Sequence, residues 1–167
     1  AKKSAVSYAN TDLRKKVLTG NPVRREISEI QRRDKSADQK KLGIPNTNLL
    51  VVVTGGSLGA RRINEATIDA LRNLGEIENL SVYHIVGRRD WELLDIPDQV
   101  ESVDYRTIEY ETDMPTVLNA ADLIISRAGG SITAEISVLG IPAILIPLPH
   151  APGDHQRKNA ESLVNAG

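Results

Sequence analysis

A continuous apolar run followed directly by glycines constrains the fold of this 167-residue chain more than any other feature. The run LLVVVT at residues 49–54 is β-branched and lacks polar alternation, which is typical of a strand buried on both faces of a parallel sheet. GGSLGA follows at 55–60, and the apolar spacing over 60–74 then predicts a helix. A buried strand, a glycine turn and a helix in this order indicate a doubly wound α/β fold.

The rest of the chain continues this alternation of strands and helices. Further strands are expected at 81–87, 99–105, 122–126 and 142–147, and further helices at 89–95, 114–121, 130–139 and 154–166. In the helix over 60–74, the expected apolar stripe consists of Ile63, Ala66, Ala70, Leu71 and Leu74. Together these elements predict a Rossmann-like parallel sheet with helices on both faces.

The segment before residue 49 differs from the rest in pattern and charge. Weak alternation predicts short strands at 4–9 and 15–20, and the apolar spacing over 23–42 predicts one amphipathic helix that ends before Gly43. Residues 1–50 hold 12 Lys or Arg and five Asp or Glu, a net charge of +7, whereas the remaining residues carry a net −8. Most of the positive charge is interpreted as the solvated face of that helix, and a minority as a basic site or a contact for a neighbouring domain.

Composition and absent motifs exclude several classes of function. The absence of Cys removes disulfides, thiolate metal sites and cysteine nucleophiles. A net charge of −1 and an aromatic content of 3% argue against a nucleic-acid partner, which requires basic surfaces and stacking platforms. Neither DxD, GxSxG nor a Walker phosphate loop occurs. His150 and His155 lack a third ligand at a plausible spacing, so no metal site is expected.

The expected carboxyl ends of the strands carry candidate site residues, because ligands of doubly wound sheets bind there. The glycines within 55–60 allow an anion to approach the amino terminus of the next helix, although a plain glycine-rich turn is the alternative. After the strand at 122–126 come two glycines and Ser131, with Glu135 one turn into the following helix. A carboxylate there either accepts hydrogen bonds from two ribose hydroxyls or stabilises the helix dipole.

Two further segments carry polar side chains next to predicted strands. Gln156 and Asn159 follow the strand at 142–147 on one helix face, and their amides can donate to and accept from sugar hydroxyls. Arg24 follows the turn residues GNP, where a planar cation can meet a phosphate, although a solvated arginine is the favoured interpretation of this position in isolation.

Five motifs spread over nearly the whole chain carry a family resemblance. They are TGNPVR (19–24), GGSLGARRIN (55–64), the DM within 111–130, AEISVLGIPAILIPLP (134–149) and DHQRKNA (154–160). In this order they resemble the donor-binding half of the MurG family of bacterial glycosyltransferases. Members of that family add N-acetylglucosamine to undecaprenyl-pyrophosphoryl-muramyl-pentapeptide (lipid I to lipid II) in peptidoglycan synthesis, and they have the two-domain GT-B fold.

The resemblance implies a set of residues that bind the donor, UDP-N-acetylglucosamine. The set is Arg24, Gly56, Ser57, Tyr110, Glu111, Met114, Gly129, Gly130, Ser131, Glu135, His155, Gln156 and Asn159. Within it, Glu135 would bind the ribose hydroxyls, while Ser57, Arg24 and the loop at 129–130 would face the diphosphate. The backbone near Tyr110, with Met114 beside it, would frame the uracil, and the amides at 156 and 159 would bind the sugar.

The resemblance also implies how this chain relates to a whole enzyme. Residues 1–14 are expected to be a remnant of the preceding domain and a linker, and residues 15–167 a donor-binding domain truncated at its carboxyl-terminal end. The catalytic residues are expected in an amino-terminal domain that also holds the lipid-linked acceptor, so this chain alone would be inactive. No cofactor is implied, and the full-length protein would be cytoplasmic and peripheral on the inner membrane of a bacterium. The alternatives are the donor domain of another GT-B enzyme, of the glycolipid-synthase or the subunit type, and a non-catalytic UDP-sugar-binding module.

Overall fold

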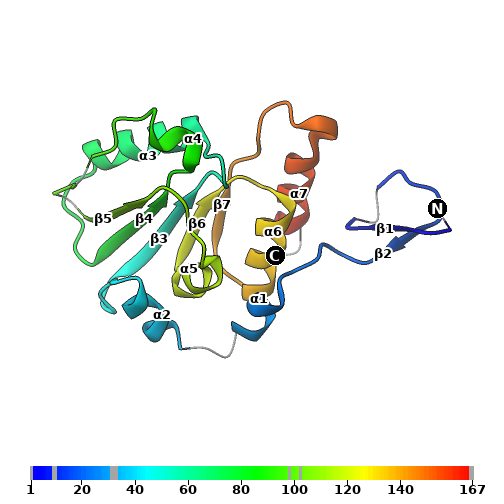
Figure 1. Cartoon of the computed structure of the whole chain (residues 1–167), viewed down its shortest axis with the longest axis horizontal. Helices are drawn as coiled ribbons and strands as arrows, with labels where there is room; N and C mark the ends of the chain where they lie inside the picture. The colour runs from blue at the N-terminus through cyan, green and yellow to red at the C-terminus, as the bar shows by residue number, and fades with distance from the viewer. Residues whose placement is uncertain (1, 9–10, 31–33, 98, 102, 166–167) are drawn as a thin grey trace.

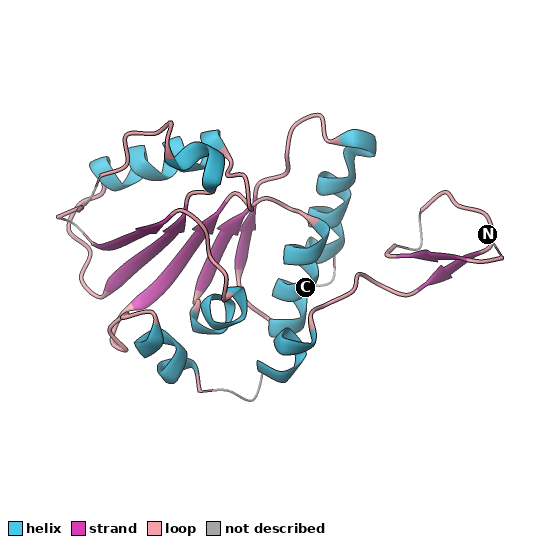
Figure 2. Ribbon diagram, in the orientation of Figure 1, coloured by secondary structure: helices cyan, strands magenta, loops and turns pink. Residues whose placement is uncertain are grey.

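The computed structural model describes residues 2–8, 11–30, 34–97, 99–101 and 103–165, and its main body is one sheet between layers of helices (Figures 1 and 2). The strands are β1 (Ser4–Val6), β2 (Lys16–Leu18), β3 (Leu49–Thr54), β4 (Leu80–Ile85), β5 (Asp104–Ile108), β6 (Leu123–Ser126) and β7 (Ala143–Leu145). The helices are α1 (Arg25–Ile30), α2 (Lys35–Lys41), α3 (Arg61–Asn73), α4 (Arg88–Trp91), α5 (Met114–Ala120), α6 (Gly130–Leu139) and α7 (His155–Val164), with a 3-10 turn at Pro152–Asp154.

The main sheet is parallel and has the strand order β5-β4-β3-β6-β7. Within this sheet, β3 comes first in sequence, and β4 and β5 follow on one side of it. The chain then crosses to the other side of β3, where β6 and β7 lie. Val52 on β3 is accordingly in register with Tyr83 on one side and with Ile124 on the other. The predicted doubly wound fold is therefore confirmed, and its direction of winding reverses between β3 and β6, where such folds form a ligand crevice.

Both faces of the sheet are buried because successive side chains of a strand point to opposite sides. On β3, Leu50 and Val52 belong to the core beneath α1, α5 and α6, whereas Val53 packs with Ile63 and Leu71 of α3 on the other face. Figure 2 shows the helices on either side of the magenta strands. This two-sided burial explains why the β3 sequence is apolar without alternation.

The amino-terminal segment lies apart from the main sheet (Figure 1). There β1 pairs in parallel with β2, both shorter than predicted, and residue 9 lies outside the described residues. Asn21 joins this segment to the main body, because its Oδ1 accepts from the Ser7 hydroxyl at 2.5 Å and its Nδ2 donates to the Gly130 carbonyl at 3.2 Å. No helix in the described part of the chain is long and apolar enough to cross a membrane.

The prediction of one helix over 23–42 was wrong. Two separate helices, α1 and α2, occupy this range, and residues 31–33 between them lie outside the described residues. Asp34 has an extended backbone (ψ 117°), and its carboxylate accepts from the Ser36 N–H at 3.0 Å. An Asp in this position is the N-cap of a helix, so α2 is a separate helix and not a continuation of α1.

The third strand of the sheet was predicted too early, at 99–105. The observed β5 spans Asp104–Ile108, and residue 102 lies outside the described residues. Val100 and Val103 pack against the core from the connecting segment, so their apolar character does not mark a strand. The other strands of the sheet and α3 to α6 lie within a few residues of their predicted bounds, as does α7, whose predicted end at 166 lies outside the described residues.

The buried face of α3 also differs from the predicted stripe. Ala66 and Ala70 are exposed, while Ile68 and the polar Asn64 are buried beside Ile63 and Leu71. Exposed alanines cost little in a helix, so the two alanines fit a solvent-facing row. A completely buried Asn has to find hydrogen-bond partners inside the protein, and these are described below.

Candidate functional site

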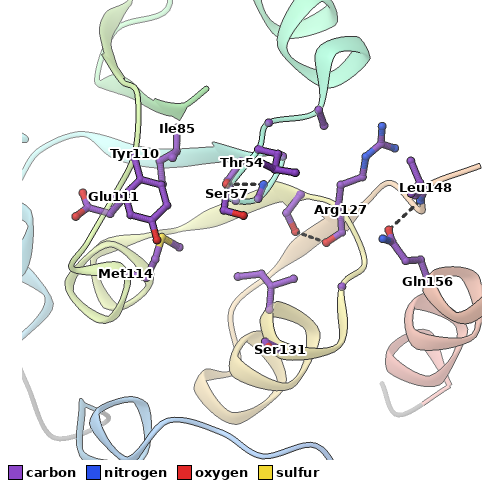
Figure 3. A pocket seen from close by; sticks show the side chains of 18 of the residues that line it. Thr54, Ser57, Ile85, Tyr110, Glu111, Met114, Arg127, Ser131, Leu148 and Gln156 are labelled. Atoms are coloured by element: carbon purple, nitrogen blue, oxygen red, sulfur yellow. Dashed lines mark hydrogen bonds between the residues drawn. The ribbon is translucent and has the colours of Figure 1, made fainter. Parts of the chain in front are cut away.

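A cavity of about 1160 Å³ opens at the carboxyl ends of the central strands. Its lining includes Thr54, Ile85 and Ser126, which are the last residues of β3, β4 and β6. The cavity therefore sits at the point where the winding of the sheet reverses, as expected for a ligand site in this fold. Figure 3 shows Tyr110 and Met114 on one side of the cavity and Gln156 and Leu148 on the other.

The loop at 55–60, called the glycine loop below, forms one wall of the cavity. Gly56 and Gly59 have φ of +90° and +89°, a region that side chains other than glycine rarely adopt. The Gly59 N–H donates to the Gly56 carbonyl at 2.9 Å, which closes the loop into a tight turn. Ala60 precedes α3 and has no side chain that could cap it, so the first turn of α3 offers backbone N–H groups to a ligand.

The loop before α6 forms a second wall, with Gly129 as the residue preceding the helix and Ser131 in its first turn. Glu135 lies further along α6, and its side chain is only 5% exposed. Its two carboxylate oxygens accept from Arg24 Nε at 2.7 Å and from Arg24 Nη2 at 3.0 Å. This hydrogen bond is the main cause of the raised pKa of Arg24. The two predicted residues are thus in direct contact, and both line the cavity.

A third wall comes from the segment between β5 and α5. Tyr110, Glu111 and Met114 line it, and the Arg88 guanidinium stacks over the Tyr110 ring at 3.9 Å from the ring centre. Glu111 accepts from the Asp113 N–H at 2.6 Å and from the Tyr83 hydroxyl at 2.9 Å. The first of these hydrogen bonds lies within the segment between β5 and α5, and the second ties that segment to Tyr83 on β4.

The predicted residues on α7 divide into two groups. Gln156 lines the cavity, and its side-chain oxygen accepts from the Leu148 N–H at 2.9 Å (Figure 3). Asn159 is buried and does not line the cavity, and its amide donates to the Ala128 carbonyl at 3.0 Å. Asn159 thereby holds the loop before α6, while His155 is exposed with its Nδ1 2.8 Å from the Pro152 carbonyl oxygen.

The structure brings most of the predicted set together. The residues that line the cavity are Arg24, Gly56, Ser57, Tyr110, Glu111, Met114, Gly129, Ser131, Glu135 and Gln156, and those that do not are Gly130, His155 and Asn159. Within the described residues, no group of three His, Cys, Asp or Glu side chains is arranged to hold a metal ion.

Sequence reasoning missed a set of arginines around the glycine loop. Besides Arg24, the cavity is lined by Arg61, Arg62, Arg89 and Arg127. Burial lowers the pKa of Arg127, and repulsion from the neighbouring Arg62 lowers it further. The doubled arginine that follows the glycine loop was the sequence signal for this feature. A cavity with this lining favours an anionic ligand.

The fold and the site together define a doubly wound α/β domain whose arginine-lined cavity lies at the reversal point of a parallel sheet, beside two helix amino termini. The family described as "Glycosyltransferase family 28 C-terminal domain" matches residues 50–167. The chain therefore belongs to this glycosyltransferase family.

Relatives and solved structures agree with this assignment. The chain is 41% identical to a protein of Desulfitobacterium hafniense and 37% identical to one of Moorella thermoacetica, over 96% and 92% of its length. Both are named UDP-N-acetylglucosamine–N-acetylmuramyl-(pentapeptide) pyrophosphoryl-undecaprenol N-acetylglucosamine transferase. The crystal structure of Acinetobacter baumannii MurG matches all of the chain with a TM-score of 0.69 and 28% identity.

The match covers only part of each relative. The chain spans 44% of the Desulfitobacterium protein, 42% of the Moorella protein and 45% of the Acinetobacter structure. The glycotransferase of kitacinnamycin shares the fold over 72% of the chain, with a TM-score of 0.54 and 20% identity.

Proposed function

We propose that this chain is the donor-binding domain of a transferase that moves N-acetylglucosamine from UDP-N-acetylglucosamine to lipid-linked muramyl-pentapeptide. The observation that carries the proposal is the position of Glu135. Its carboxylate is buried on α6, the helix that begins at Gly130, and it lines the same cavity as the glycine loop. A group that only accepts hydrogen bonds suits the two hydroxyls of a ribose, and the glycine loop suits the phosphates attached to that ribose.

The remaining walls of the cavity fit the other parts of the donor. The Tyr110 and Glu111 backbone, with Met114 below it, would frame the uracil, and Gln156 would contact the sugar from α7. The diphosphate would lie between Ser57 and the first turn of α6, where both helix amino termini present positive dipole ends.

The same groups would assist the chemical step. When the acceptor hydroxyl oxygen bonds to the anomeric carbon, the bond from that carbon to the diphosphate breaks, and UDP leaves with the electron pair. Negative charge then grows on the diphosphate, and Arg24 and the helix amino termini, which line the cavity, would stabilise it. The hydroxyl proton has to pass to a base, which we place in an acceptor-binding domain outside this chain.

The division into parts is also a proposal. Residues 1–14 would belong to the connection with the acceptor domain, and residues 15–167 to the donor domain. The share of each relative that the chain spans, less than half, is consistent with a second domain of similar size. Such an enzyme would act on its lipid-linked acceptor at the cytoplasmic face of a bacterial inner membrane, with the acceptor domain making the membrane contact.

A titration of this chain with nucleotide sugars tests the donor proposal. We expect UDP-N-acetylglucosamine to shift the amide resonances of Gly56, Gly59, Gly129 and Ser131, and GDP-mannose to leave them unchanged. UDP-glucose should shift the same amides but bind more weakly, because it lacks the acetamido group. If no UDP compound shifted these resonances, the donor proposal would be wrong. If GDP-mannose bound equally well, the uracil assignment would be wrong.

The contact between Arg24 and Glu135 predicts effects of opposite sign for two ligands. In Arg24→Gln, UDP should bind about tenfold more weakly, because the diphosphate loses a cation. Uridine should bind several-fold more tightly, because its hydroxyls no longer compete with the guanidinium for the carboxylate. Calorimetric titration of both ligands measures these changes, and Arg25→Gln, at an exposed neighbour paired with Glu29, is the matched control. Equal weakening of both ligands would instead mean that Arg24 only holds Glu135 in place.

A further inference from the structure

A set of completely buried polar side chains lies behind the glycine loop and is not used by the site described so far. Asn64 on α3 and His84 on β4 are 0% exposed, and Asp90 on α4 is 1% exposed. Apolar side chains at such positions would stabilise a core without needing partners, whereas polar ones cost free energy unless they are hydrogen-bonded. Three polar residues on three neighbouring elements therefore call for an explanation beyond packing.

The hydrogen bonds among these residues have one consistent set of directions. The Asn64 amide nitrogen donates to the Val86 carbonyl at 2.9 Å and to Asp90 Oδ2 at 3.0 Å, so Asn64 Oδ1 is the acceptor that faces His84. His84 Nε2 must then carry the proton and donate to Asn64 at 2.9 Å. His84 Nδ1 is left as an acceptor, and the Tyr105 hydroxyl donates to it at 2.8 Å. Each of these polar groups therefore has a hydrogen-bond partner, and the hydrogen-bonded network runs from Tyr105 on β5 to Asp90 on α4.

The far end of this network contacts the glycine loop. Asp90 Oδ1 accepts from Arg89 Nε at 2.8 Å, and Arg89 Nη2 donates to the Gly59 carbonyl at 3.4 Å. Asp90 Oδ2 lies so close to the loop that a Cβ added to Gly59 would be 2.6 Å from it. Arg88, the first residue of α4, donates its backbone N–H to the Ser57 carbonyl of the loop at 3.2 Å. The start of α4 therefore holds the glycine loop at two of its carbonyls.

We propose that Asn64 and Asp90, backed by His84 and Tyr105, are positioning residues that hold the glycine loop in the conformation that binds the donor diphosphate. The inference rests on the proposed function for its ligand. Glycine-rich segments lose more backbone entropy on ordering than other segments do, so a loop of this kind gains affinity when the protein orders it beforehand. Asn64 connects α3, which begins at the loop, with α4, which holds the loop from behind.

Two substitutions test this proposal with different severity. Asn64→Asp replaces the donor that faces Val86 and Asp90 with a second negative charge. Asp90→Asn keeps the shape but removes the charge that pairs with Arg89. The matched controls are Asn73→Asp at an exposed position of the same helix and Asp95→Asn at a fully exposed side chain. If Asn64→Asp does not fold, Asp90→Asn decides the outcome.

The measurements are the dissociation constants of UDP and uridine and the hydrogen exchange of the Gly59 and Arg88 amides. In either variant we expect UDP to bind about tenfold more weakly and uridine within about twofold of the unaltered chain. Both amides should exchange faster, because the turn that protects Gly59 and the bond from Arg88 to Ser57 are loosened. The controls should match the unaltered chain. A merely structural role would lower the stability of the folded state without changing the ratio of the two affinities.

The possible failures are distinguishable. If the unaltered chain does not bind UDP, the proposed function is wrong, and the hydrogen exchange of the variants still decides whether the network orders the loop. If the unaltered chain binds UDP and Asp90→Asn leaves both the affinity ratio and the exchange rates unchanged, the positioning role is wrong and the proposed function stands.

Discussion

Replacing Glu135 with Gln is expected to weaken UDP binding to this chain by about a hundredfold. A carboxylate would accept from both ribose hydroxyls, and each hydrogen bond to a charged group is worth about 1.5 kcal/mol or more. Removing the charge that both hydroxyls meet should therefore cost about 3 kcal/mol of binding free energy. Gln preserves the shape, and Arg24 is 46% exposed, so it can turn to solvent without a large loss of folding stability. Calorimetric titration with UDP measures the affinity, and a thermal melt monitored by circular dichroism measures the stability.

A deoxy ligand makes this test specific for the ribose. The unaltered chain should prefer UDP to 2′-deoxy-UDP by about tenfold, and Glu135→Gln should lose most of that preference because the hydroxyl no longer meets a carboxylate. Glu161→Gln on α7, where Glu161 pairs with the exposed Arg157 at 2.9 Å, is the matched control and should behave like the unaltered chain. Undiminished discrimination in Glu135→Gln would remove the ribose role.

The buried His84 predicts a large loss of stability in mild acid. Burial lowers the pKa of His84 from 6.5 to about 4, so the unfolded chain binds a proton in a range where the folded chain does not. Above pH 6.5 His84 is neutral in both states, so the free energy of unfolding should not depend on its titration. As the pH falls from 6.5 to 4, protonation of His84 in the unfolded chain should lower the free energy of unfolding by about 3 kcal/mol in total. Two ionisable groups share its hydrogen-bonded chain: Tyr105, whose pKa burial raises to about 12, and Asp90 beyond Asn64.

Urea denaturation at several pH values measures this contribution by difference. His84→Gln should be less stable than the unaltered chain at pH 7, and the gap should shrink by about 3 kcal/mol on going to pH 4. The matched control is His155→Gln, which replaces an exposed histidine. A constant gap between the unaltered chain and His84→Gln would mean that His84 titrates alike in the folded and unfolded states.

The parts of the fold that were predictable from sequence are those whose pattern has a single physical cause. LLVVVT at 49–54 was placed to the residue, because an apolar β-branched run bounded by glycine fits a strand buried on both faces. The break before α2 was not predictable from periodicity, because it depends on the Asp34 side chain competing for a backbone N–H. The position of β5 was missed because Val100 and Val103 enter the core from a segment that is not a strand.

The site shows the same division. The glycine loop and the segment around Glu135 were located from motifs at strand ends, since the topology brings those ends together. The partners of individual side chains were not located, because they depend on packing between distant segments. Asn159 was predicted to bind a sugar; the structure shows it buried, with its amide donating to the Ala128 carbonyl, and this partner could not be read from the sequence. The buried hydrogen bonds of Asn64 could not be predicted either, because a polar residue at this position of the helix is equally compatible with an exposed face.

The contact between Arg24 and Glu135 joins residues that are 111 positions apart in the chain. Between them lie β3, α3, β4, β5 and β6, so the cavity cannot assemble until both sides of the sheet have formed around β3. Closing a loop of this length costs backbone entropy, which the packing of the intervening elements has to offset. A ligand that binds only the assembled cavity therefore stabilises the domain against global unfolding rather than protecting one half alone. Ligand binding to this cavity would then measure the fraction of molecules in which the whole sheet is folded.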